Sequence, residues 1–169
     1  MDKKWLKIHG KKEIDFAMRT STLKYLSETK TTLLFDKEDN LIAYLNNIEI
    51  PGNNSRAVDI MRRDPEINYN GVMEFLFLNE IIKAKEDGKK YYNLGVSPLA
   101  NMDKALADNK LAFKLLRLIY EKQRNYYDFK GLYNFKLKFN PIIRQTHLIY
   151  PKQISLPRVL WALLNIFIR

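Results

Sequence analysis

The stretch AVDIMRRDPEINYNGVMEFLFLNEIIKAKEDGKKYYNLG, residues 57–95, decides the fold. An apolar run ending in charges is followed by a polar loop, a long amphipathic segment and a second apolar run. Apolar residues recur through residues 72–87 at helical spacing, and Gly88 stands where a left-handed helix cap is expected. The pattern predicts a strand, a crossover helix and a second, parallel strand. Ligands of such sheets bind near the loop that enters the helix, which is residues 62–71.

The residues before this stretch predict antiparallel strands. Residues 32–50 hold two apolar runs around a cluster of turn formers, the pattern of a β-hairpin, and turn residues recur at 51–54. Three antiparallel strands thus lead into the parallel strand–helix–strand unit. The order predicts an α+β fold with a mixed sheet, of the GNAT acyltransferase type, in a single domain over residues 1–169.

Composition bounds the function. The 169 residues carry a formal net charge of +10, and such a positive field favours polyanions, either nucleic acid or an anionic membrane surface. A basic surface without a specific partner is about equally consistent with the charge alone. There is no cysteine and there are two histidines, so no metal site and no cofactor are expected. The first residues lack the pattern of a signal peptide, which favours a cytoplasmic protein.

Two late segments allow alternative interpretations. Residues 126–139 alternate from Leu132 onward, which predicts a strand with Lys136 and Lys138 about 7 Å apart on one face. Two lysines on a solvated face are the plain alternative. Residues 156–168 are almost wholly apolar and predict a C-terminal helix, docked either on the core or on a membrane surface.

Four collinear motifs resemble a known family. VDIMRR, NGVMEFLF, YYNLGVSPLA and FKGLYNFKLKFNP are similar, in order and spacing, to the C-terminal catalytic domain of bacterial phosphatidylglycerol lysyltransferases and related aminoacyl-phosphatidylglycerol synthases. The resemblance runs from about Phe16 to the C-terminus. It implies transfer of an amino acid, lysine being favoured, from aminoacyl-tRNA to phosphatidylglycerol at the inner face of the cell membrane. Because the tRNA ester is already activated, no nucleotide or metal is implied.

The resemblance also implies site residues. Asp59 and Arg62 match an Asp-x-x-Arg pair, with the acid in the amino-acid pocket and the arginine on an oxyanion or phosphate; an ordinary strand-end salt bridge is the alternative. On a regular strand these side chains point to opposite faces, so a shared site requires the strand to end or bulge near Met61. The expected substrate-binding residues are Arg63, Asp103, Lys136 and Lys138.

Two other functions stay open. The first is an N-acyltransferase that uses acyl-coenzyme A, but residues 62–71 have one glycine, a proline without an amide hydrogen and two acids, a poor cradle for pyrophosphate. The second is a non-catalytic half that binds tRNA or membrane. Members of that family usually carry a second copy of the fold and often a multispan membrane region, so a shortened member, a fragment of a longer protein and a separately expressed domain with a partner domain elsewhere are the alternatives.

Overall fold

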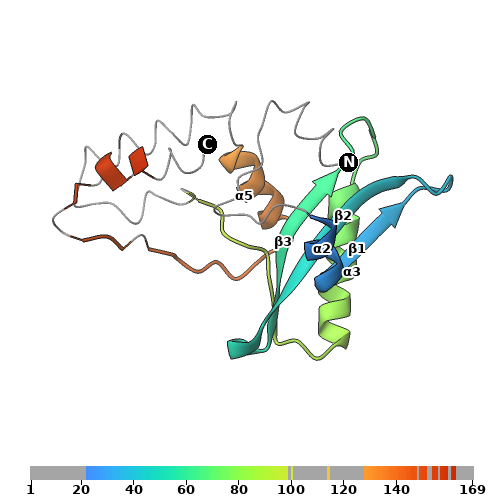
Figure 1. Ribbon diagram of the computed structural model, residues 1–169, viewed down its shortest axis with the longest axis horizontal. Helices are drawn as coiled ribbons and strands as arrows, with labels where there is room; N and C mark the ends of the chain where they lie inside the picture. Colours follow the sequence, from blue (N-terminus) through green and yellow to red (C-terminus); the bar gives the residue numbers. More distant parts are fainter. Residues whose placement is uncertain are drawn as a thin grey trace. The chain divides into compact units, whose positions relative to one another are not determined.

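Residues 22–95 form a four-stranded sheet with a helix on each face, as the computed structural model shows (Figure 1). The structure describes residues 22–98, 100, 114, 128–147, 149–151, 154, 155, 157–159, 161 and 162. The chain divides into two units that meet in sequence between Gly95 and Val96. We name the first the sheet unit and the second the C-terminal unit. The single domain predicted over residues 1–169 stays a prediction.

The predicted hairpin is confirmed. Strand β1 (Lys30–Phe35) pairs antiparallel with β2 (Leu41–Ile50). Between them, the carboxylate of Asp36 accepts the backbone N–H groups of Glu38 at 3.0 Å and Asn40 at 2.8 Å. This side chain closes the turn that its cluster of Asp and Asn residues predicts.

The predicted mixed sheet is confirmed as well. After the short helix η1 (Pro51–Asn53), strand β3 (Ser55–Arg63) pairs antiparallel with β2 and parallel with β4 (Tyr91–Asn93). The sheet order is therefore β1-β2-β3-β4. Antiparallel strands leading into a parallel unit are the arrangement predicted for an α+β fold of the GNAT type, and that fold class is confirmed.

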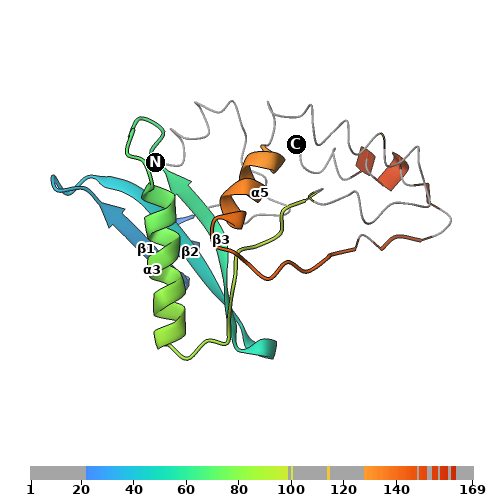
Figure 2. The ribbon, with the colours of Figure 1, turned by 180° about the vertical axis from the view of Figure 1, so that it is seen from behind.

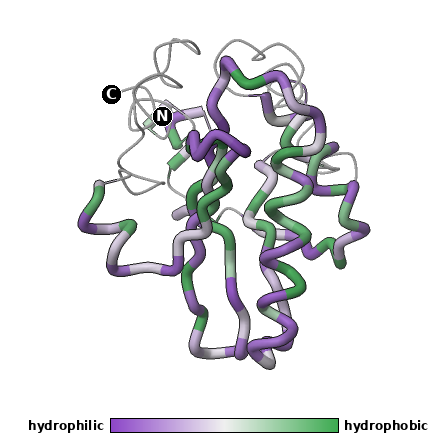
Figure 3. The backbone as a smooth tube through the Cα atoms, turned by 90° about the vertical axis from the view of Figure 1, so that its right-hand side faces the viewer, coloured by the Kyte–Doolittle hydropathy of each residue, from purple (hydrophilic) through white to green (hydrophobic). Residues whose placement is uncertain are grey.

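Helix α3 (Val72–Glu86) is the predicted crossover. Gly88 has a φ of +71°. Its N–H donates to the carbonyl of Lys85 at 3.0 Å, while the N–H of Lys89 donates to that of Ala84 at 2.9 Å. Both bonds define a Schellman cap, which needs a residue that tolerates positive φ, as glycine does. Hydrophobic residues recur along the whole helix (Figure 3).

The two helices of the sheet unit cover opposite faces of the sheet. Helix α2 (Leu23–Glu28) lies in front of the strands in Figure 1, and α3 lies in front of them in the reverse view (Figure 2). Leu45 of β2 and Phe77 of α3 are both 0% exposed, and Leu76 and Ile60 are both 2% exposed. This apolar core fixes the strands whose ends carry the candidate site.

In the C-terminal unit the strand predicted over residues 126–139 is wrong. Phe129–Leu137 form the helix α5, whose cap is the side chain of Asp128 accepting the N–H of Gly131 at 2.8 Å. The rings of Phe135 and Phe139, four residues apart, meet edge to face at 5.4 Å. A short alternating run fits both periods, and the cap and the aromatic pair decide for the helix.

The C-terminal helix predicted over residues 156–168 is helical at 157–159, 161 and 162, and its other residues lie outside the described part of the chain. Among the described residues, no helix has the length and apolar character needed to cross a membrane.

Candidate active site

A bulge in β3 brings the two predicted catalytic residues to one face of the sheet. The register pairs residues 45–47 of β2 with residues 58–61 of β3, so three residues of one strand oppose four of the other. In a regular strand, alternation would place Asp59 and Arg62 on opposite faces. The extra residue between them reverses the alternation once, and both return to the same face.

That face is the one covered by α2. Arg62 pairs with Tyr44, which lies on the same face of β2 as Asn46. Asn46 hydrogen-bonds the segment that follows α2. The neighbouring Asn47 points to the other face and donates to Glu80 of α3 at 2.7 Å. The strand irregularity that a shared site requires is therefore present, and it aims the pair away from α3.

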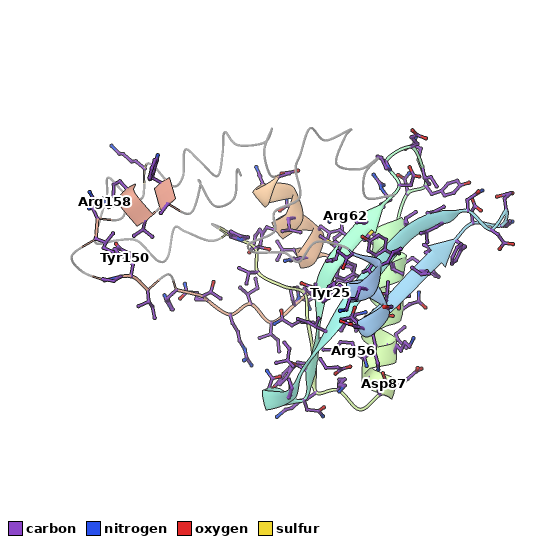
Figure 4. All side chains as sticks on the ribbon, viewed as in Figure 1. Tyr25, Arg56, Arg62, Asp87, Tyr150 and Arg158 are labelled. Atoms are coloured by element: carbon purple, nitrogen blue, oxygen red, sulfur yellow. The ribbon has the colours of Figure 1, made fainter. Side chains whose placement is uncertain are left out.

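Asp59 is held by a residue that the sequence did not single out. Its side chain is half-buried, and Oδ2 accepts a hydrogen bond from the hydroxyl of Tyr25 on α2. Arg62 is also half-buried and donates through Nη1 to the carbonyl of Met61 at 2.9 Å. Tyr25 and Arg62 are labelled in Figure 4. No chemistry was predicted around residue 25, because a lone tyrosine between Lys24 and Leu26 carries no motif.

Arg63 does not join this pair. It pairs with Ala43, one position beyond Arg62, so it lies on the α3 side of the sheet, where it is exposed. The loop beyond it begins with Asp64, whose carboxylate accepts the N–H of Glu66 at 2.9 Å. Besides the two acids of the loop, Asp64 and Glu66, Glu74 lies in the first turn of α3. Carboxylates around a helix N-terminus compete with a bound phosphate, which disfavours coenzyme A at this loop.

The C-terminal unit holds the two predicted lysines, but not on one face. Because residues two apart on a helix point about 200° from one another, Lys136 and Lys138 diverge. Lys136 is 7% exposed, and its Nζ donates to the carbonyl of Val96 at 2.9 Å. Burial lowers the pKa of Lys136 from 10.5 to about 8. Lys138 is exposed, with its Nζ 6.0 Å from the centroid of the Phe135 ring.

A second group of charges lies at the far end of the sheet unit from Arg62 (Figure 4). The side chain of Arg56 is 0% exposed and bonds Glu49 at 3.0 Å and Asp87 at 2.5 Å. The hydrogen bond from Lys89, which has the largest effect, and the one from Arg56 lower the pKa of Glu49. The hydrogen bond from Arg56, which has the largest effect, and the one from Lys30 lower the pKa of Asp87. These contacts join α3 to the ends of β1, β2 and β3, so the cluster has a structural role.

Asp103 lies outside the described residues. Across the described part of the chain, no three His, Cys, Asp or Glu side chains gather closely enough to hold a metal ion.

Comparisons with known proteins agree on one family. A family model described as "Phosphatidylglycerol lysyltransferase, C-terminal" matches residues 1–150. The phosphatidylglycerol lysyltransferase of Staphylococcus epidermidis is 30% identical over 153 residues, which are 90% of this chain and 18% of that protein. The Bacillus subtilis enzyme of the same name is 31% identical over 147 residues, 87% of this chain and 17% of that protein.

A solved structure, that of L-PGS from Bacillus licheniformis, matches with a TM-score of 0.74 and 26% identity over 98% of this chain and 48% of that one. The chain thus spans less than a fifth of the curated relatives and about half of the solved relative.

Proposed function

Because the chain belongs to the family of phosphatidylglycerol lysyltransferase C-terminal domains, we propose that it moves an amino acid, lysine being favoured, from aminoacyl-tRNA to a hydroxyl group of phosphatidylglycerol. The observation that carries the proposal is the bulge that puts Asp59 and Arg62 on one face of the sheet. A carboxylate and a guanidinium on the same face of the sheet suit a substrate with an ammonium group and a developing oxyanion. The proposal extends the relatives' activity to a chain that spans 18% of their length.

The reaction needs positioning more than activation. The lipid hydroxyl attacks the ester carbonyl of the aminoacyl-tRNA, the hydroxyl proton leaves, and the tRNA ribose oxygen departs with a proton. Asp59 would bind the amino group of the amino acid. Arg62 would donate to the carbonyl oxygen as it gains negative charge, or to the lipid phosphate. Such preorganised charges lower the barrier because they need no rearrangement during the reaction.

A lipid acceptor agrees with the surface of the C-terminal unit. Large apolar side chains there are unusually exposed: Ile142 is 80%, Ile149 90% and Trp161 68% exposed. The basic side chains of Arg144 and Arg158 lie in the same segments and are exposed. Apolar side chains with nearby cations favour the headgroup region of an anionic bilayer, so we propose a peripheral location at the inner face of the cell membrane.

The remaining predicted residues take smaller parts in the proposal. Lys138 and Arg63 are exposed and can contact phosphates of tRNA or lipid. Lys136 is buried and bound to Val96, so its part is to hold that loop in place rather than to meet phosphate in solution. Asp103 stays a predicted substrate-binding residue.

The second candidate function is a non-catalytic module that binds tRNA or membrane. The observation that favours it is that this chain covers only 48% of the solved relative, so part of a composite site could come from a partner domain. Both functions predict binding of tRNA and of anionic vesicles, and only the first predicts turnover.

The test is transfer of label into lipid. The purified chain is incubated with lysyl-tRNA or alanyl-tRNA, labelled on the amino acid, and with phosphatidylglycerol vesicles. The variant Asp59→Asn removes the charge of the site. Asp39→Asn is the matched control, since Asp39 is exposed in the β1–β2 turn with a φ of +60°, a conformation that asparagine tolerates.

We expect label in the chloroform phase, reduced about 100-fold in Asp59→Asn and retained in Asp39→Asn. The donor that works identifies the amino acid. Binding of tRNA without label from either donor would replace the transferase with the binding module. Label that survives Asp59→Asn unchanged would move the site elsewhere.

A further inference from the structure

Helix α2 is held on the sheet by polar contacts. None of its six residues is fully buried, and side-chain hydrogen bonds hold its C-terminal end. The hydroxyl of Thr29 donates to the carbonyl of Tyr25 at 2.7 Å, and that of Thr31 donates to the carbonyl of Leu26 at 3.0 Å. Two threonines beyond the end of the helix therefore hold the backbone from which the Tyr25 ring extends.

Both threonines depend on one buried amide of the central strand. Asn46 is 0% exposed, and its Nδ2 donates to the hydroxyl of Thr29 at 2.5 Å and to that of Thr31 at 2.8 Å. Asn46 lies opposite the bulge of β3, the irregularity that turns Asp59 toward the same face. The residue that anchors α2 and the bulge that presents Asp59 thus occupy one place in the sheet.

We propose that Tyr25 is a positioning residue for Asp59 in the transfer reaction, an inference that rests on the proposed function. The Tyr25 hydroxyl donates to Oδ2 of Asp59. That bond restricts rotation of the carboxylate and leaves Oδ1 as the oxygen to face the ammonium group of the aminoacyl donor. The helix contributes an orienting hydroxyl, and the sheet contributes the charge.

A substitution can separate the positioning role of Tyr25 from a role of its ring in packing. Tyr25 is half-buried, whereas Leu23, Lys24, Ser27 and Glu28 of the same helix are exposed. Tyr25→Phe preserves the ring and deletes the hydroxyl that donates to Asp59. A matched control is Ser27→Ala, since the Ser27 hydroxyl also makes one hydrogen bond from α2, to the exposed carbonyl of Lys24 at 2.8 Å.

The experiment compares these variants in the label-transfer assay, alone and combined with Asp59→Asn. A hydrogen bond to a charged group contributes about tenfold or more when it acts in the transition state. We expect Tyr25→Phe to lower kcat/KM for the aminoacyl donor about tenfold and Ser27→Ala to change it less than about twofold. In the Asp59→Asn background, Tyr25→Phe should cause no further loss, because the negative charge that it positions is gone.

A second measurement does not depend on turnover. In protein labelled with ¹³C at the aspartate carboxyl groups, Tyr25→Phe should shift the Asp59 resonance, assigned from Asp59→Asn, and Ser27→Ala should leave it in place. An unmoved resonance would overturn the inference. So would a double variant whose loss of kcat/KM equals the product of the losses in Tyr25→Phe and in Asp59→Asn, because two independent residues behave in that way. A wild-type chain without turnover would remove the proposed function and the positioning role with it, even if the resonance moved.

Discussion

Two carboxylates lie on opposite faces of the same sheet and differ in their burial and in their hydrogen bonds. Glu80 of α3 is 2% exposed, and both of its oxygens accept from the protein: Oε1 from Thr32 and Oε2 from Asn47 at 2.7 Å. Tyr92 extends this network by donating to Asn47 at 2.6 Å. Asp59, on the α2 face, is half-buried and accepts from Tyr25 through Oδ2.

The difference separates an acid that holds the fold from an acid available to a substrate. Every contact of Glu80 ties α3 to β1 and β2, so its charge is satisfied inside the protein. Burial, with the negative charge of Glu80 nearby, also raises the pKa of Tyr92 well above its ordinary value, so its hydroxyl stays a donor. On the α2 face, the bulge and the helix hold Asp59 without enclosing it. Substitutions on the two faces should therefore affect different properties.

The largest effect is expected on the α3 face. Glu80→Ala leaves the buried amide of Asn47 and the hydroxyl of Thr32 without their acceptor, so we expect the free energy of unfolding to fall by about 4 kcal/mol. Urea denaturation measures it. Glu80→Gln is the control, since an amide can accept from Asn47 and donate to Thr32 at a smaller cost. Full stability combined with lost turnover in Glu80→Ala would contradict this division of the two faces.

On the α2 face the same kind of change should act on activity instead. Asp59→Asn keeps an oxygen that can accept from Tyr25, so unfolding should change by less than about 1 kcal/mol. Loss of the charge should lower turnover about 100-fold, which corresponds to about 2.7 kcal/mol of transition-state stabilisation. Label transfer and denaturation of the same preparation provide both values. A variant that loses stability and activity in parallel would place Asp59 among the structural acids.

The sheet unit could be predicted because its signals are local. The turn residues of the hairpin, the helical spacing across residues 72–87 and Gly88 each act through the backbone that carries them. The bulge could only be stated as a condition on Asp59 and Arg62, since it arises from register between β2 and β3 and not from a motif. Tyr25 is 34 residues from Asp59 in sequence, and nothing in its neighbours marks that contact.

The error at α5 has a different origin. Alternation from Leu132 onward fits a strand, and the decisive opposing features, the cap at Asp128 and the ring pair of Phe135 with Phe139, are weak in sequence. One consequence is that the burial of Lys136 was missed, because a strand would have placed it on a solvated face.

Lys136 is a third charged residue to compare with Glu80 and Asp59. It is buried, and its Nζ donates to the carbonyl of Val96. Its pKa, lowered to about 8 by burial, lies below that of a lysine in the unfolded chain, so between these values the unfolded state binds more protons. Stability should therefore rise with pH, by about 2 kcal/mol between pH 7 and 9.5. Denaturation at a series of pH values in this range measures the change in stability. The range stops at pH 9.5 because the tyrosines of the unfolded chain ionise at higher pH. Lys136→Met should abolish the rise; a rise that persists would assign it to other groups.

The smallest effect concerns the cap of α3 and sharpens the comparison of the two faces. A Cβ added at Gly88 meets no atom within 4 Å, so Gly88→Ala tests only the backbone conformation at a φ of +71°. Alanine is strained there, and we expect the free energy of unfolding to fall by about 1 kcal/mol. Turnover of the folded protein should not change, because the cap lies at the end of α3 and not on the α2 face.

Gly52→Ala is the matched control for this last variant. Gly52 also has open space for a Cβ, but it does not have a positive φ, so the same methyl group carries no backbone strain. Denaturation of the two alanine variants therefore isolates the cost of the left-handed cap. Equal stabilities would mean that the Schellman cap does not require glycine at Gly88, and a loss of turnover in Gly88→Ala alone would show that α3 influences the opposite face of the sheet.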